Sequence, residues 1–253
     1  MRYPWLVEQN IVHHRKVFNL ATNIIVPSQA TKQLLLRNNV DESAIEVIHH
    51  GVTPFQRKVK SVPENRPIRF GFVGRYGYDK GLHVLFKAIE KITMQNTCEL
   101  HIYGATQGIA EKKYFHDIID DYKGIVKYYD HGFVDNAELQ KAYENIDVVV
   151  VPSIQFETFG LVVNEALSAG CPVIVSRSGG MTELVEEKKY GFVVEHNNVD
   201  AIARALKYFI DNPSSVAVMS QNTPSVKTFP EYTAQMENVY LNIIHKDHPV
   251  REN

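Results

Sequence analysis

The chain has 253 residues, of which 44% are hydrophobic and 22% charged, a composition typical of globular proteins that excludes a disordered or fibrous one. The 27 Lys and Arg residues against 29 Asp and Glu give a formal net charge of −2, so no overall positive field is available to gather nucleic acid. An anionic ligand must therefore be held by local groups, and we expect no nucleic-acid partner.

Membrane and metal signals are weak in the sequence. No run of 18 apolar residues occurs and no apolar stretch follows a basic start, which predicts a cytoplasmic protein, with peripheral membrane attachment left open. Cys98 and Cys171 lie in apolar stretches without CxxC spacing and are interpreted as buried free thiols. The pairs His13–His14 and His49–His50 form no metal-ligand motif and are interpreted as ordinary surface or core residues.

The first 55 residues predict a short alternation of helices and strands. We expect a helix over about 6–19, a strand over TNIIVP, a helix that begins after Ser28, and a strand over IEVIHHGV. Two strands cannot form an α/β domain alone, so residues 1–55 are interpreted as the remnant of a larger domain. Residues 56–67 contain Pro63, Pro67 and many charges, and are interpreted as a linker.

From residue 68 onward, apolar strands alternate with helical segments. The candidate strands are IRFGFV, ELHIY, IVKYY, DVVVVP, PVIVS and GFVVE. The expected helices are one with its apolar face at Leu82, Leu85, Ile89 and Ile92, and others over about 109–122, 136–146, 160–169, 180–187 and 199–211. This alternation predicts a doubly wound, Rossmann-like parallel α/β sheet over 68–228, which binds ligands beyond the carboxyl ends of its strands. A final helix over about 230–245 is expected within a tail, 229–253.

The first candidate site lies where strand IRFGFV meets its helix, in the sequence Gly74 to Gly81, GRYGYDKG. Small residues let the backbone approach a ligand, and Arg75 and Lys80 place two cations near a helix N-terminus that itself favours anions. This combination suits a diphosphate. The alternative is a glycine-containing turn whose Arg and Lys are simply solvated.

The second candidate site combines Glu157 with Glu165, which lies in a helix with apolar residues on most sides. A buried carboxylate needs hydrogen-bond donors, and ligand hydroxyls could supply them. The alternative is that a backbone amide or an arginine elsewhere satisfies Glu165. The eight-residue separation spans about 12 Å in a helix, so the two acids suit hydroxyl groups on either side of a diphosphate that faces the helix N-terminus.

Taken together, the motifs resemble the family 4 retaining glycosyltransferases of GT-B fold. The resemblance rests on GRYGYDKG, on HGFVDNAELQKAYENIDVVVVPS, on ETFGLVVNEALSAGCPVI with its E-x7-E pair, and on SGGMTELVE and YGFVVE. It covers about residues 68–210 and implies the C-terminal, nucleotide-sugar-binding domain of such an enzyme. The implied reaction is transfer of a hexose-type sugar in glycan biosynthesis with retention of anomeric configuration.

The resemblance also implies roles for individual residues. Arg75 and Lys80 would bind the donor diphosphate and stabilise the charge of the departing nucleotide, Glu157 would contact the donor sugar, and Glu165 the ribose hydroxyls. The resemblance also implies that Gly74 binds the donor. Phe133 and Val134 would border the base, and Phe159, Gly160 and Leu161 would contact the phosphate and sugar. Arg75, Lys80 and Glu157 are thus the implied catalytic residues, although Glu157 is not expected to act as a nucleophile.

No D-x-D motif occurs, which agrees with a metal-independent reaction in which two cationic side chains replace a divalent ion. We therefore expect no metal and no cofactor, because the nucleotide-sugar is the donor substrate.

The sequence departs from the family at its start, because residues 1–55 resemble only the end of the family's N-terminal acceptor domain. His13 and His14 fall in the wrong segment to supply the histidine of that domain. Three explanations stay open: a truncated chain, an acceptor-domain polypeptide or self-association that completes it, or a non-catalytic nucleotide-sugar-binding module. A glycan, lipid or protein acceptor is compatible with the sequence, and an epimerase is a less favoured third function.

Overall fold

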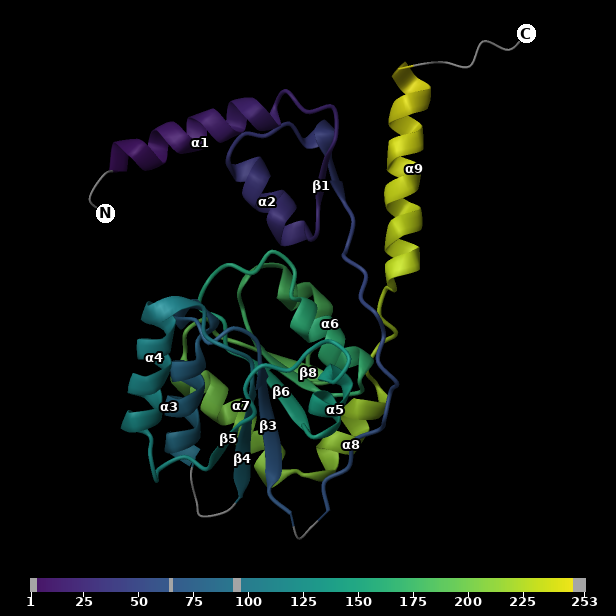
Figure 1. Cartoon of the computed structure of the whole chain (residues 1–253). Helices are drawn as coiled ribbons and strands as arrows, with labels where there is room; N and C mark the ends of the chain where they lie inside the picture. The colour runs from purple at the N-terminus through teal and green to yellow at the C-terminus, as the bar shows by residue number, and fades with distance from the viewer. Residues whose placement is uncertain (1–3, 64–65, 93–96, 248–253) are drawn as a thin grey trace. The chain divides into compact units, whose positions relative to one another are not determined.

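The computed structural model describes residues 4–63, 66–92 and 97–247 (Figure 1). Contacts divide the chain into two compact units. Unit 1 runs to Gly51 and resumes at Lys227, and unit 2 comprises Val52–Val226. The expected division differs from this one, because the predicted linker belongs to unit 2 and the C-terminal helix groups with the N-terminal residues.

Unit 1 contains a two-stranded parallel sheet with helices. Its elements are α1 (Pro4–Phe18), β1 (Ile24–Val26), α2 (Gln29–Arg37), the 3₁₀ helix η1 (Glu42–Ala44), β2 (Ile45–Val47) and α9 (Phe229–Asp247). As the sequence predicts, Ser28 caps α2, and its hydroxyl oxygen accepts the Thr31 amide at 3.0 Å. A small core of Ile24, Val26, Val40 and Ile45 fills the space between the sheet and α2.

Unit 2 is a six-stranded parallel sheet with helices on both faces. Its first half comprises β3 (Ile68–Val73), η2 (Tyr78–Lys80), α3 (Leu82–Ile92), β4 (Cys98–Tyr103), α4 (Gly108–Asp121), β5 (Tyr128–Asp130) and α5 (Leu139–Glu144). Its second half comprises β6 (Val148–Val151), α6 (Leu161–Ser168), β7 (Val173–Ser176), η3 (Gly179–Leu184), β8 (Gly191–Val194), α7 (Val199–Asp211) and α8 (Ser214–Gln221). The strand order is β5-β4-β3-β6-β7-β8, which confirms the predicted doubly wound sheet.

The central strands of unit 2 are buried on both faces, so their side chains divide between two cores. Phe70 on β3 and Ile174 on β7 point to the core covered by α3, α4, α7 and α8. Val149 on β6 and Val173 point to the core covered by α5 and α6. This alternation follows the two-residue period of a strand and explains why the strands read as nearly continuous apolar runs.

The strand order reverses between β3 and β6. The chain proceeds from β3 outward to β4 and β5, then returns to pair β6 against the other side of β3. The segments after these strands, 74–81 and 152–160, therefore leave neighbouring positions at the carboxyl ends of the strands, which we call the carboxyl edge. Doubly wound sheets bind ligands at such a reversal.

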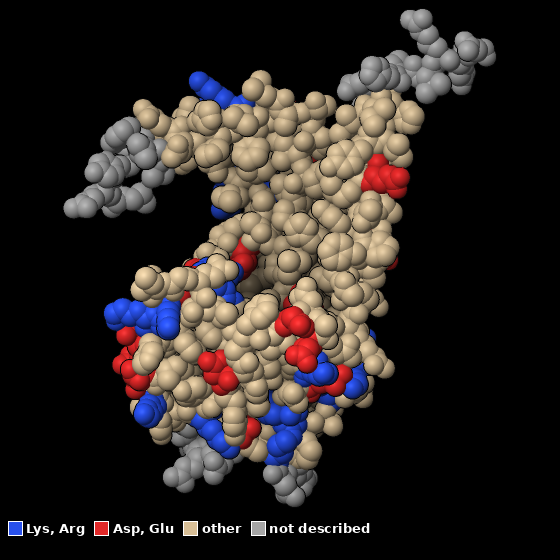
Figure 2. Space-filling model, in the orientation of Figure 1, with Lys and Arg blue, Asp and Glu red and all other residues tan. Residues whose placement is uncertain are grey.

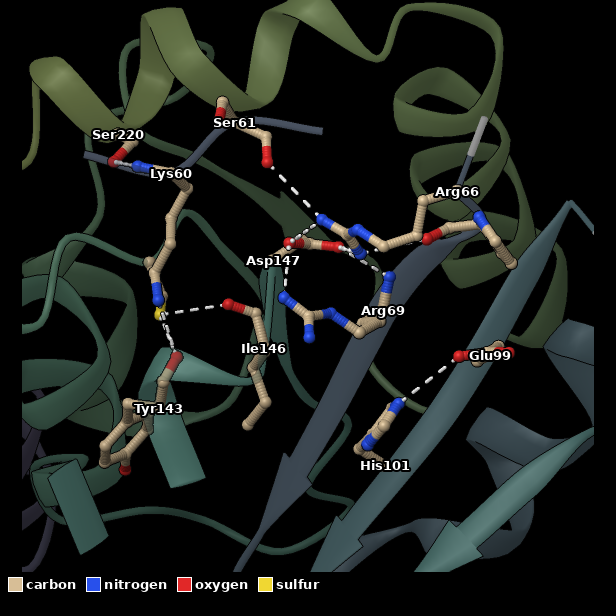
Figure 3. A network of polar contacts seen from close by, with 12 residues as sticks. Lys60, Ser61, Arg66, Arg69, Glu99, His101, Tyr143, Ile146, Asp147 and Ser220 are labelled. Carbon is tan, nitrogen blue, oxygen red and sulfur yellow. Dashed lines mark hydrogen bonds and ion pairs between the residues drawn. The ribbon is translucent and has the colours of Figure 1, made fainter. Parts of the chain in front are cut away.

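The expected linker is instead an extended segment bound to unit 2. The Lys60 amide donates to Ser220 Oγ at 2.8 Å, and its ammonium donates to the Tyr143 carbonyl at 2.7 Å (Figure 3). Arg66 binds both oxygens of Asp147 at 2.7 and 2.9 Å. Charges and prolines in the sequence suggested an exposed segment. In the structure, Lys60 and Arg66 instead hydrogen-bond to acceptors on the buried residues Tyr143 and Asp147.

Smaller differences concern the second half of the sheet. The helix expected over 180–187 is the 3₁₀ helix η3, and α8 was not predicted. Cys98 and Cys171 are buried and free, as expected. Lys and Arg side chains alternate with Asp and Glu over the face of unit 2 in Figure 2, which agrees with the near-neutral composition. In the part of the chain that the structure describes, no helix has the length and apolar character needed to span a bilayer.

Candidate functional site

The loop after β3 presents Arg75 at the carboxyl edge. Gly74 has φ +145°, and a Cβ there would meet no atom within 4 Å, so the backbone borders open space. The Arg75 guanidinium binds both oxygens of Asp79 at 2.7 Å and also contacts the Glu111 carboxylate on α4. Its side chain keeps 32% of its surface exposed, so the cation is bound but accessible.

Lys80 and Glu157 join the loops that follow β3 and β6. Lys80 Nζ lies 2.7 Å from Glu157 Oε1, and the buried Ser153 hydroxyl donates to the same oxygen at 2.5 Å. The Ile154 amide donates to the Asp79 carbonyl at 2.9 Å, which holds the two loops together. Residues separated by 77 positions in the chain thus form one charged cluster at the strand reversal.

A pocket of about 260 Å³ opens beside Arg75. Its lining comprises Val73, Gly74, Arg75, Tyr103, Gly104, Ala105, Gln107, Phe133, Val134 and Leu139. Most of these walls are apolar or aromatic, and the Phe133 ring is 77% exposed. The loops after β3, β4 and β5 therefore build a slot that suits a flat ring, with Arg75 at its border.

The start of α6 follows Glu157 directly. Gly160 precedes the helix with φ +112°, and a Cβ at this position would clash with the Met181 side chain, so only glycine fits. Phe159 is buried, whereas Leu161 is half exposed. The first amides of a helix lack intrahelical acceptors and favour an anion, so this turn can receive a phosphate.

Glu165 lies within α6 and has a protein partner that the sequence did not indicate. The Tyr143 hydroxyl donates to Glu165 Oε2 at 2.9 Å. Burial raises the pKa of the Glu165 carboxyl, and this hydrogen bond lowers it in part. The sequence left a backbone amide or an arginine as the protein donor, and the structure places a tyrosine there.

The structure brings the predicted residues into three adjoining groups at the carboxyl edge. Lys80 and Glu157 are in direct contact, and Gly74, Arg75, Phe133 and Val134 share the pocket. Phe159, Gly160 and Leu161 begin the helix that carries Glu165. Within the described residues, no hydrogen bond or ion pair joins Glu165 directly to Arg75, Lys80 or Glu157.

Four further residues shape this site. Ser153 closes the apolar run VVVVPS, and Asp79 lies inside GRYGYDKG, so both stand within motifs already singled out. Glu111 and Tyr143 had no local signal, because one reads as an exposed helix residue and the other as a core aromatic. Among the residues that the structure describes, no cluster of three or more His, Cys, Asp or Glu side chains could hold a metal ion.

Comparison with known families decides the class of protein. The sequence profile described as "Glycosyl transferases group 1" matches residues 53–226. The chain belongs to this family. The match covers the whole sheet of unit 2 and all three groups at the carboxyl edge, and it confirms the prediction at the level of a glycosyltransferase family.

The relatives of this chain within the family are longer than the chain. An uncharacterized glycosyltransferase of Methanocaldococcus jannaschii is 33% identical over 179 residues, which are 65% of this chain and 44% of that protein. A D-inositol 3-phosphate glycosyltransferase of Paenarthrobacter aurescens is 31% identical over 198 residues, 74% of this chain and 48% of its own length. The chain thus spans less than half the length of these relatives.

A solved structure supports the fold. Anabaena HepE, crystallised in complex with UDP and glucose, superposes with a TM-score of 0.78 at 20% identity, over 92% of this chain and 67% of HepE. The predicted GT-B architecture is therefore confirmed for the part that superposes.

Proposed function

We propose that unit 2 binds a nucleoside diphosphate sugar and that the chain supplies the donor-binding half of a family 4 retaining hexosyltransferase. The contact between Lys80 and Glu157 carries this proposal most directly. Lys80 belongs to the motif GRYGYDKG and Glu157 to the motif ETFGLVVNEALSAGCPVI. Their contact lies at the strand reversal, where doubly wound sheets bind ligands.

The diphosphate lies between Arg75, Lys80 and the first turn of α6 in this proposal. Both cations are held by carboxylates at hydrogen-bonding distance, and both keep about a third of their side-chain surface exposed, 32% and 27%. A diphosphate also presents paired anionic oxygens that accept hydrogen bonds from these cations, so it can replace the carboxylates. Two cations stabilise the charge of a departing nucleotide, so we propose that the reaction requires no metal.

The nucleoside occupies the pocket beside Arg75 and reaches Glu165. Phe133, Val134 and Leu139 offer apolar surface to a base, and Glu165 has one oxygen that the Tyr143 hydroxyl does not use. HepE, which shares the fold, was crystallised with UDP and glucose. This supports a nucleotide-sugar donor and leaves the base of this chain's donor open.

Glu157 contacts the hydroxyls of the donor sugar in the proposal. The Ser153 hydroxyl donates to Glu157 Oε1 and still holds the carboxylate when the diphosphate takes Lys80, so the other oxygen is available to the sugar. We propose retention by front-face attack, in which the leaving phosphate helps to deprotonate the acceptor. Glu157 then orients the sugar and does not form a bond to it.

The acceptor side is proposed to come from chain beyond unit 2. Unit 1 contributes two strands to a sheet, too few for an α/β domain, and the chain spans 44% of its archaeal relative. We propose that unit 1 is the end of an acceptor domain that further polypeptide completes. The second candidate is a non-catalytic nucleotide-sugar-binding module. The two-stranded sheet of unit 1 favours it as well, because such a module needs no complete acceptor domain.

Calorimetric titration with UDP, GDP, ADP and their sugar conjugates tests the shared premise. At least one should bind, and Arg75→Ala should weaken it while Arg204→Ala, a matched change at an exposed position of α7, should not. Glu165→Gln should weaken free nucleotide, whereas Glu157→Gln should weaken only the sugar conjugate. Failure of every ligand to bind would remove the basis of both candidates, and binding without turnover in the completed enzyme would favour the module.

A further inference from the structure

Tyr143 is the buried neighbour of Glu165. It lies on α5, has no exposed surface, and its hydroxyl hydrogen-bonds Glu165 Oε2 across the boundary between α5 and α6. Twenty-two positions separate the two residues, so the contact depends on tertiary packing. A phenylalanine would fill nearly the same space, which indicates that the hydroxyl itself has a role.

Tyr143 is fixed on several sides. Its ring packs against Phe55 at 5.3 Å between centroids, and its carbonyl accepts the Lys60 ammonium at 2.7 Å (Figure 3). The Cys171 thiol also donates to this carbonyl, at 3.4 Å. The hydroxyl therefore has a defined position from which it can orient another group.

The hydroxyl remains a donor across the physiological pH range. Burial, followed by the charge of Glu165, raises the pKa of Tyr143 well above its ordinary value, so the phenol stays protonated. Tyr143 is the described group that hydrogen-bonds Glu165, whereas Lys60 and Cys171 contact the Tyr143 carbonyl. A carboxylate with one oxygen bound in this way keeps its second oxygen for a ligand.

We propose that Tyr143 is a positioning residue for nucleotide recognition: its hydroxyl binds one oxygen of Glu165 and directs the other to the ribose hydroxyls of the donor. The inference rests on the proposed function, because there Glu165 is the ribose ligand. Tyr143 acts through Glu165 and does not itself touch the nucleotide. Its effect must therefore depend on the ribose hydroxyls.

Titration of Tyr143→Phe with three kinds of ligand tests this dependence. UDP, GDP and ADP are tried against the wild-type chain, and the one that binds is compared with its 2′,3′-dideoxy form and with inorganic pyrophosphate. The variant should bind the ribonucleotide about 3- to 10-fold more weakly, the loss expected for one ordinary hydrogen bond because the effect is transmitted through Glu165, and the other two ligands equally well. Tyr122→Phe removes a hydroxyl from the opposite core and should change none of the affinities.

A pH profile and a double variant separate positioning from stability. Without the hydroxyl, the pKa of Glu165 should rise. As the pH is lowered, Glu165 should then be protonated earlier, and ribonucleotide affinity should begin to fall at a higher pH than in the wild-type chain. In the Glu165→Gln background, Tyr143→Phe should add no further loss. Circular dichroism checks that each variant is folded at the titration temperature.

The possible outcomes are distinct. Three results would overturn the positioning role. The first is an equal loss of affinity for ribonucleotide, dideoxynucleotide and pyrophosphate, and the second is additive losses of affinity in the double variant. The third is an unchanged ribonucleotide affinity in Tyr143→Phe. A wild-type chain that binds none of the nucleotides would instead overturn the proposed function and this inference with it.

Discussion

Two arginine–aspartate contacts lie at opposite ends of the strands of the same sheet, one at the amino ends and one at the carboxyl ends. Arg66 binds Asp147 before β6, where the carboxylate is 2% exposed and also accepts the Arg69 amide at 2.8 Å (Figure 3). Arg75 binds Asp79 after β3, where the carboxylate is 26% exposed and Arg75 is its side-chain partner. The chemistry is the same, but Asp147 is buried whereas Asp79 is partly exposed, and we propose that a ligand can replace Asp79 at Arg75.

The difference follows from desolvation. A buried carboxylate that loses its cation keeps a charge that water cannot reach, so breaking the pair strongly lowers the stability of the domain. A partly exposed pair costs little to open, because water and a phosphate can replace the carboxylate. The amino ends of the strands thus hold the structural pair, and the carboxyl edge holds the exchangeable one.

The largest effect should come from breaking the buried pair. Asp147→Ala should lower the free energy of unfolding by about 3–5 kcal/mol, because it removes the carboxylate that binds two guanidinium groups and the Arg69 amide. Asp79→Ala should lower it by about 1 kcal/mol or less. Urea denaturation measures the free energy of unfolding of both variants. An equal decrease in the two would contradict the distinction between the buried and the partly exposed contact.

The second effect concerns ligand affinity. Arg75→Ala should weaken nucleotide binding by about 10- to 100-fold, the value expected for charge-assisted hydrogen bonds to a phosphate, with little change in unfolding free energy. Arg66→Ala should show the reverse pattern, with reduced stability and unchanged affinity of the folded protein. Calorimetry and denaturation on both variants give the comparison, and a loss of affinity in Arg66→Ala would contradict it.

Local patterns predicted the fold and much of the site. Strand and helix periodicity indicated all six strands of unit 2, and the sequence placed Glu157 shortly before α6 and Glu165 within it. What the sequence could not indicate was which atoms meet, such as Tyr143 with Glu165 or Lys60 with the Tyr143 carbonyl. Periodicity shows that a side chain is buried, but the partner depends on how distant elements pack.

A smaller effect should follow from Glu111, the second carboxylate on Arg75. Glu111→Gln removes a charge that competes with the diphosphate, so nucleotide affinity should rise about two- to fivefold. Asp117→Asn, a matched change in an exposed pair on the same helix, should leave affinity unchanged. Weaker binding in Glu111→Gln would indicate that this carboxylate orients Arg75 for the ligand.

The smallest effect is a pH dependence of stability. Burial raises the pKa of Glu165 above its ordinary 4.5, so the folded state binds this proton more tightly than the unfolded chain. The stability that the group contributes is therefore greatest below pH 4.5 and falls as pH rises through the folded pKa. Relative to the wild-type chain, Glu165→Gln should gain stability at pH 7 and gain little at pH 4. A larger relative gain at pH 4 would contradict this direction.

A crystal structure with the nucleotide that binds best would test the central claim most directly. The diphosphate should lie between Arg75 and Lys80 in place of their carboxylate partners, with the ribose hydroxyls at Glu165 and the base beside Phe133. A nucleotide bound at the opposite edge, near Arg66 and Asp147, with the Lys80–Glu157 pair unchanged, would show that the carboxyl edge is not the donor site.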